Sequence, residues 1–223
     1  MSLILNIDTS TDFATITLAE DGKVLKSISN TIQKDHAAFL HPAVNEVLQS
    51  GERKISDLDA IAVTAGPGSY TGIRVGLAAA KGLSLALNIP LITINTLLLL
   101  AKDAILNHTS GTDILFCPVI DARRMEVFTA VYNNTLSEIL SPCTMILTNN
   151  SYDDFLMNNK VFFFGNGSEK LKNIIQNQNA FYIENVNIPF ALSQHTYELY
   201  LSKSFTDLIY SEPFYLKEFY TGT

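Results

Sequence analysis

Residues 3–18, LILNIDTSTDFATITL, decide the fold, because their pattern returns at residues 114–128 as ILFCPVIDARRMEVF. In each stretch an apolar run ends in an aspartate, Asp8 or Asp121, and a polar turn leads into a second apolar run. Apolar runs joined by a short turn are typical of paired β-strands. The repeat predicts an internal duplication with a β-hairpin at the start of each half.

The spacing of apolar residues and turn signals extends each hairpin into a longer unit. The first half is expected to hold strands at 3–7, 14–18, 24–28, 60–64 and 91–94, with helices at 36–48, 70–87 and 96–106. The second half is expected to hold strands at 114–121, 126–132, from 136 and 161–164, short helices at 151–157 and after 168, and a last helix within 189–204. The pattern predicts an α/β protein of two domains, residues 1–110 and a smaller unit at 111–223.

Composition limits the classes of function. With 15 Lys and Arg against 22 Asp and Glu, the formal net charge is −7, which disfavours a chain that grips nucleic acid by itself. Charged residues make up only 17% and hydrophobic residues 47%, so some apolar surface is expected to be covered by a partner. The chain is expected to have no export leader and no membrane span, and Cys117 and Cys143 are expected to be free thiols of a cytoplasmic protein.

The stretch GPGSYTGIRVGLAAAKGL, residues 66–83, follows a predicted strand and opens a predicted helix, an arrangement that suits an anion. It is neither a Walker phosphate loop nor a dinucleotide fingerprint. Together with the turn after the first strand, it supplies the anion-binding candidates Asp8, Thr9, Ser10, Thr11, Gly66, Gly68, Ser69 and Thr71. A tight polar turn is the simpler interpretation of residues 8–11. The small residues of the helix favour close packing or association.

Metal binding by histidines and phosphate binding by the DARR arginines have little support in the sequence. His36 and His41 are five residues apart, so they do not lie together on a helix as a metal-binding pair, and His108 and His195 stand alone. Arg123 and Arg124 in DARR could hold phosphate or a partner's carboxylate. The simpler alternative, a solvated turn in which Asp121 acts as a cap and the arginines pair with nearby acids, is favoured on composition.

Taken together, ILNIDTST (4–11), the helix from His36, GPGSYTGIRVGLAAAKGLSLAL (66–87), DARRMEVF (121–128) and PFYLKE (213–218) closely resemble the TsaB family, also called YeaZ. The resemblance covers nearly the whole chain. It implies a two-lobed actin-like ATPase fold, related to ribonuclease H, with duplicated β-β-β-α-β-α lobes of which the second is reduced. It also implies a non-catalytic paralogue of TsaD in the machinery that makes threonylcarbamoyladenosine in tRNAs reading ANN codons.

The catalytic relative carries two metal-binding histidines four residues apart on the helix after the glycine-rich one. The comparable stretch here, INTLLLLA (94–101), has Thr96 and Leu100 at those places, so no metal, no cofactor and no catalytic residue are expected. Asp8 to Thr11 are then interpreted as a vestige of a phosphate loop.

The resemblance further implies that the first two helices pair with TsaD, or with a second copy when the chain is alone. The residues matching that interface are Phe39, Leu40, Ala43, Val44, Val47, Ile73, Leu77 and Ala80. Core packing competes for the same side chains, so roughly half of them are expected to serve the interface. A charge at Ala43 or Ala80 is expected to prevent pairing with TsaD and leave the fold intact.

The implied partners also include the ATPase TsaE, with tRNA met only indirectly and no membrane involved. The alternative from another class is an independent enzyme, a small ATPase using Asp8 and residues 66–72 or a peptidase. A third possibility, a protease-like regulator of TsaD, lacks an evident nucleophile and base.

Overall fold

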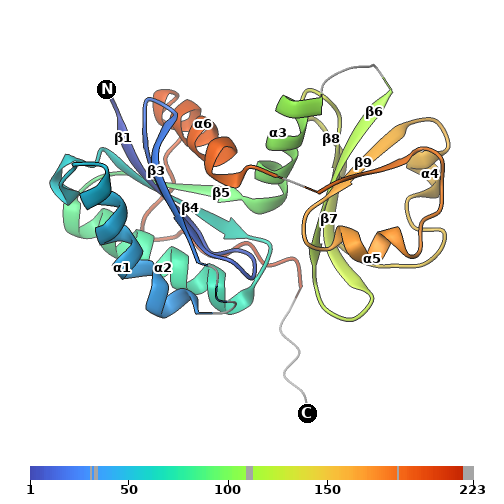
Figure 1. Ribbon diagram of the computed structural model, residues 1–223, viewed down its shortest axis with the longest axis horizontal. Coiled ribbons are helices and arrows are strands. Elements are labelled where there is room, and N and C mark those ends of the chain that lie inside the picture. The colour runs from blue at the N-terminus through green and yellow to red at the C-terminus, as the bar shows by residue number, and fades with distance from the viewer. Residues whose placement is uncertain (31, 33–34, 109–112, 185, 218–223) are drawn as a thin grey trace, which may run out of the picture. The chain divides into compact units, whose positions relative to one another are not determined.

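The computed structural model describes residues 1–30, 32, 35–108, 113–184 and 186–217 (Figure 1). The chain divides into two compact units, Met1–Leu99 with Asn187–Phe214, and Leu100–Val186 with Tyr215–Thr223. This division differs from the expected one at residue 110, because the last helix returns to the first unit. Its buried residues Ala191 and Leu192 pack there against β-strand side chains such as Ile4 and Ile92.

The first unit is built on a five-stranded sheet of order β3-β2-β1-β4-β5. Its strands are β1 (Leu3–Asp8), β2 (Thr15–Glu20), β3 (Lys23–Ser29), β4 (Ala60–Gly66) and β5 (Leu91–Asn95). Its helices are α1 (His36–Ser50), η1 (Ile55–Asp57), α2 (Tyr70–Leu87), the start of α3 (Thr96–His108) and α6 (Ile188–Leu201). β1 and β2 are antiparallel, whereas β4 and β5 continue parallel to β1 because helices connect them.

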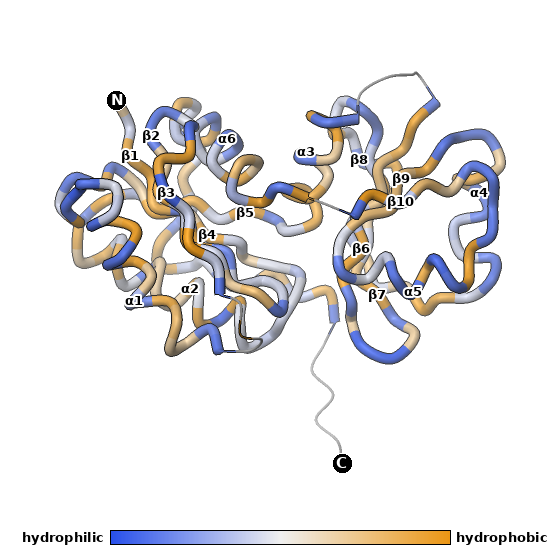
Figure 2. Tube along the Cα trace, in the orientation of Figure 1, coloured by the Kyte–Doolittle hydropathy of each residue, from blue (hydrophilic) through white to orange (hydrophobic). Residues whose placement is uncertain are grey.

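Both faces of this sheet are covered, which explains the continuous apolar runs of β1 and β4. Leu5 and Ile61 point toward α1 and α2, and their chain neighbours Ile4 and Ala60 point toward α6. Figure 1 shows α1 and α2 side by side on one face and α6 on the other. Figure 2 shows the orange, apolar colour concentrated in the central strands.

The second unit holds a sheet of order β10-β9-β6-β7-β8. Read from β8 to β10, each strand number is five higher than that of the corresponding strand in the first sheet, so the two sheets have the same strand order. Its strands are β6 (Ile114–Asp121), β7 (Glu126–Tyr132), β8 (Glu138–Ile146), β9 (Lys160–Phe164) and β10 (Ala180–Ile183). Its own helices, α4 (Asp153–Leu156) and α5 (Ser168–Lys172), are much shorter than α1 and α2. The expected duplication and the reduced second half are confirmed.

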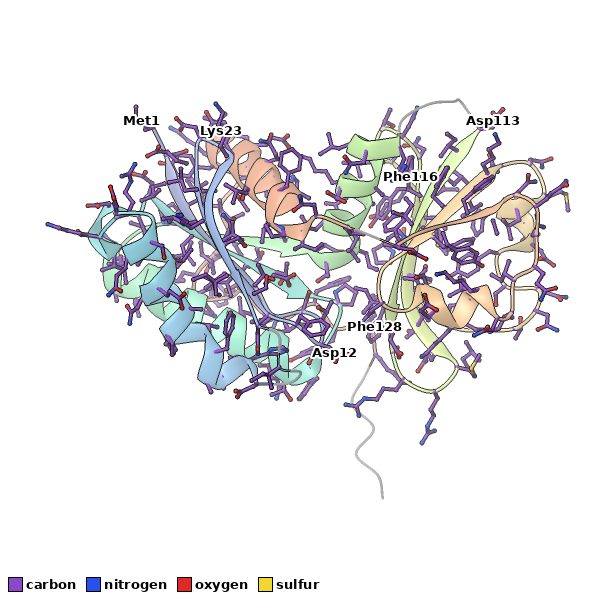
Figure 3. All side chains as sticks on the ribbon, in the orientation of Figure 1. Met1, Asp12, Lys23, Asp113, Phe116 and Phe128 are labelled. Atoms are coloured by element: carbon purple, nitrogen blue, oxygen red, sulfur yellow. The ribbon has the colours of Figure 1, made fainter. Side chains whose placement is uncertain are left out.

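The sequence analysis missed one strand of this sheet. β10, AFYI, has only four residues and lies between asparagines and glutamate, so it lacks a clear alternating pattern. It is fixed by parallel pairing with β9 and by stacking of Phe181 on Phe162, whose ring centroids are 5.2 Å apart. Phe162 also stacks on Phe116, which is labelled in Figure 3.

The core of the second unit contains a small polar network. Tyr152 donates a hydrogen bond to Thr129 Oγ1 at 3.0 Å, and Thr129 donates to the carbonyl of Pro118, also at 3.0 Å. The sulfur of Cys117 lies 3.4 Å from the same hydroxyl, and burial raises the pKa of this thiol to about 12. Cys117 and Cys143 are both unpaired, as the sequence predicts. No helix in the described part of the chain is long and apolar enough to cross a membrane.

The glycines of α2 face two different environments. A Cβ atom added to Gly72 would lie 2.1 Å from the carbonyl oxygen of Thr9, and one added to Gly76 would lie 2.2 Å from Thr9 Oγ1. A Cβ atom added to Gly82 would meet nothing within 4 Å. Gly72 and Gly76 therefore let the β1–β2 turn approach the helix backbone, whereas Gly82 lies on the outer surface.

Gly72→Ala and Gly82→Ala form a matched pair, the same substitution at two places on one helix. We expect Gly72→Ala to lower the free energy of unfolding by about 2 kcal/mol, because backbone must move to admit the methyl group. We expect Gly82→Ala to raise it by about 0.5–1 kcal/mol through helix propensity. Urea unfolding of both variants measures the difference, and equal effects would contradict the assigned contact.

Candidate functional site

The β1–β2 turn and the loop before α2 come together, as the sequence suggested for the anion-binding candidates. Asp12, labelled in Figure 3, marks this turn. The backbone N–H of Ser69 donates to the carbonyl of Ser10 at 2.7 Å, and Thr9 Oγ1 donates to the carbonyl of Gly72 at 2.7 Å. A Cβ atom on Gly68 would lie only 2.0 Å from the Ser10 carbonyl oxygen. We call this contact of residues 8–11 with residues 66–72 the turn clasp.

Asp8 lies at the centre of the turn clasp. Its carboxylate is 5% exposed, and its Oδ1 accepts three hydrogen bonds, from the Ser10 N–H, the Ser10 hydroxyl and Thr64 Oγ1. These donors, at 2.7–3.0 Å, compensate for the cost of burying a carboxylate. Asp8 Oδ1 is therefore committed to structure within its own unit.

Four backbone N–H groups of the turn clasp and the start of α2 are engaged within the chain. The N–H of Ser10 donates to Asp8, that of Ser69 to Ser10, and that of Gly72 to the hydroxyl of Ser69 at 3.3 Å. The N–H of Ile73 donates to the Ser69 carbonyl. Ser69 is the N-cap of α2. These four N–H groups can bind a phosphate only if they give up their present partners.

Of the remaining candidates, Thr11 and Thr71 lie at the edge of the turn clasp, whereas Gly66 is buried. Thr71 is exposed on the first turn of α2, and the hydroxyl of Thr11 donates to the carbonyl of Phe13 at 3.2 Å. Gly66 has a φ of 114° and ends β4, where a Cβ atom would lie 2.6 Å from the Phe214 carbonyl oxygen. A glycine is therefore required at position 66, because the backbone of Phe214 passes too close for a side chain.

Two residues that bond to the turn clasp, Thr64 and His36, were not among the predicted site residues. Thr64 is a hydroxyl inside an apolar strand, a signal that could have identified it. His36 was weighed only as a metal ligand. It is 5% exposed and its Nε2 lies 2.8 Å from the carbonyl oxygen of Thr11, whereas its Nδ1 is buried with no hydrogen-bond partner in the described part of the chain. His36 therefore supports the turn from the start of α1.

Thr96 and Leu100 lie one turn apart on α3, and both are buried. Thr96 Oγ1 has no hydrogen-bond partner in the described residues. Within the described ranges, no group of three or more His, Cys, Asp or Glu side chains is arranged to hold a metal ion.

The expected interface residues are placed differently from the prediction. Phe39 is half-buried against the first unit's core. The other seven are buried in that core: Leu40, Ala43, Val44, Val47, Ile73, Leu77 and Ala80. These side chains face β1, β2 and β4, because the apolar stripe of each helix covers its own sheet. A charge at Ala43 or Ala80, which are 2% and 0% exposed, therefore challenges folding rather than pairing.

The outward faces of α1 and α2 carry both polar and apolar residues, and the polar ones are His41, Asn45, Glu46, Gln49, Ser50, Thr71 and Arg74. The exposed positions with little or no polar side chain are Ala37, Ala38, Pro42, Ala78, Gly82, Leu85 and Ala86. Leu85 is 72% exposed. We call these seven residues the outer helix face.

The DARR motif forms the turn between β6 and β7. Asp121 accepts a hydrogen bond from the N–H of Arg123 at 2.6 Å, so its expected capping role is confirmed. The side chains of Arg123 and Arg124 are exposed.

Comparison with known proteins gives these features a family. The family model described as "TsaD: tRNA N6-adenosine threonylcarbamoyltransferase" matches residues 23–202. The tRNA threonylcarbamoyladenosine biosynthesis protein TsaB of Bacillus subtilis is 35% identical over 65% of this chain and 62% of its own length. TsaB of Buchnera aphidicola from Schizaphis graminum is 30% identical over 76% of this chain and 81% of its own. The chain thus spans slightly less than two thirds of the Bacillus relative.

Solved structures share the fold. YeaZ from Pseudomonas aeruginosa superimposes with a TM-score of 0.78 at 25% identity, covering 97% of this chain and 100% of that one. An activator of 2-hydroxyisocaproyl-CoA dehydratase from Clostridium difficile, solved with bound ADPNP, gives a TM-score of 0.53 at 7% identity over 91% and 96%. The second likeness concerns the two-lobed ATPase-like fold alone. On the family match and the sequence relatives, this chain belongs to the TsaB (YeaZ) family, within the wider group that the TsaD model describes.

Proposed function

We propose that this chain is a non-catalytic subunit in tRNA threonylcarbamoyladenosine biosynthesis, and that it binds the transferase TsaD through the outer helix face. The observation that carries the proposal is the character of that face. Ala78, Gly82 and Ala86 follow one another at four-residue intervals along α2 and are all exposed. Such a row has no role in the unit's own core.

A row of small residues suits a helical partner. Without long side chains, a second helix can approach the backbone of α2 closely, and Leu85 can insert between the side chains of that helix. The face is apolar and therefore gains from being covered. When the chain is alone, a second copy offers the same surface and forms a homodimer in its place.

The turn clasp supports a non-catalytic role. An ATPase built on this fold would need the N–H groups of Ser10 and Ser69 for phosphate, and both are bonded within the chain. A metal-dependent transfer would need imidazole ligands, and α3 carries Thr96 and Leu100 at the comparable places. We therefore propose that TsaD supplies the reaction centre, and that TsaE and tRNA act on the joint complex.

We expect Ala78→Glu to weaken binding to TsaD about a hundredfold, because the new carboxylate would be buried without a partner. The change lies on the surface, so the urea midpoint of the isolated chain should stay the same. Isothermal titration calorimetry with purified TsaD measures the affinity.

Two control variants separate binding from folding. Asn158→Glu adds the same charge at an exposed position of the second unit and should leave the affinity unchanged. Ala80→Glu places the charge in the core and should unfold the chain. If Ala78→Glu binds TsaD as tightly as the unmodified chain, the outer helix face is not the docking surface.

Reconstitution tests the role in the pathway. With purified components, we expect omission of this chain to reduce tRNA modification at least tenfold, and we expect the chain alone to modify no tRNA. Calorimetry of the isolated chain with ATP and Mg²⁺ should give no measurable binding, because the turn clasp occupies the phosphate donors. Turnover of ATP or peptide by the isolated chain would instead support an independent enzyme.

A further inference from the structure

The turn between β6 and β7 holds two consecutive arginines in a backbone conformation that favours glycine. Arg123 has a φ of 71° and Arg124 a φ of 49°. Each side chain costs roughly 1 kcal/mol in this left-handed region, whereas glycine would enter it freely. The hairpin between β6 and β7 imposes this conformation, and both side chains are exposed at the turn.

The acids of the turn are already paired with other cations. Asp121 binds the ammonium group of Lys170 at 2.6 Å, and Glu126 forms an ion pair with Lys217. Asp121 also accepts the N–H of Arg123, which holds the turn in its strained form. Both carboxylates of the turn are therefore already paired with lysines.

Arg123 and Arg124 are left with a surplus of positive charge. Across the described residues, neither guanidinium group has an ion pair or a hydrogen bond. The turn gathers four cations, Arg123, Arg124, Lys170 and Lys217, against two carboxylates, Asp121 and Glu126. The chain as a whole has a net charge of −7, whereas this turn has an excess of positive charge, which favours binding of an anion here.

We propose that Arg123 and Arg124 bind phosphate groups of an RNA backbone, and that the RNA is the tRNA of the proposed function, on which this inference rests. Each guanidinium group is positively charged and can donate two parallel hydrogen bonds to a phosphate. The proposal revises the expectation that this chain meets tRNA only indirectly. A carboxylate-rich protein surface is the other possible ligand, and the experiment below separates the two.

The test uses the full chain, alone and with TsaD, and a fluorescently labelled tRNA transcript that reads an ANN codon. Arg123→Gln with Arg124→Gln should lower the affinity for tRNA about tenfold at low salt. The slope of log K against log salt should fall by about 1.5, because two phosphate contacts are lost. The affinity for TsaD should not change.

Three controls make the result specific. Lys23→Gln with Lys26→Gln removes the same charge from exposed positions of β3 and should leave tRNA binding nearly unchanged. Arg124→Gly should raise the thermal midpoint by about 2 °C as the strain is relieved, and should still weaken tRNA binding. AMP in place of tRNA should bind far more weakly, because it offers a single phosphate.

The outcomes differ for each alternative. Unchanged tRNA affinity and salt slope in the double arginine variant would overturn the proposal, as would loss of TsaD binding with tRNA binding intact. Arginine-dependent binding of AMP as tight as that of tRNA would show a site for free phosphate instead. If TsaD does not bind the chain at all, the proposed function fails, and the measurement on the chain alone still decides the arginine site.

Discussion

The turn clasp is the contact on which the rest of the first unit depends. Thr9 and Ser10 bring their backbone against Gly72 and Gly68, at distances that leave no room for a side chain. The contact fixes the start of α2 relative to β1. Asp8 stabilises the turn by accepting three hydrogen bonds, two from Ser10 and one from Thr64. Since α2 is positioned in this way, its apolar stripe meets β4 and its small residues remain outside.

The same contact gives the turn after the first strand a structural use in this ATPase-like fold. In this architecture, the turn after the first strand and the start of the glycine-containing helix face one another, which suits phosphate binding. Here the donors bond to the chain's own oxygens, so the turn stabilises the fold instead. The second unit has the same strand order but shorter helices. Its arginine turn joins β6 to β7, which correspond to β1 and β2 of the first unit, so it corresponds to the β1–β2 turn of the turn clasp.

Much of the fold could be predicted from the sequence. The helix 70–87 and the strand 126–132 have the predicted ends, and the aspartates that close β1 and β6 revealed the duplication. β10 could not be predicted, since four residues without alternation form a strand only when β9 offers its edge. The return of α6 to the first unit also depends on contacts distant in sequence, such as Ala191 with Ile4.

The sequence by itself determined the two-lobed architecture, the family and the residues that gather at the β1–β2 turn. It determined that α1 and α2 each have an apolar stripe, because periodicity reports which residues avoid water. Only the tertiary structure decided that Leu40, Ile73 and Ala80 avoid water by packing on their own sheet, since a core and an interface have the same apolar composition. The backbone angles of Arg123 and Arg124 were likewise decided by the β6–β7 hairpin, because the turn that joins two paired strands fixes the φ values of its residues.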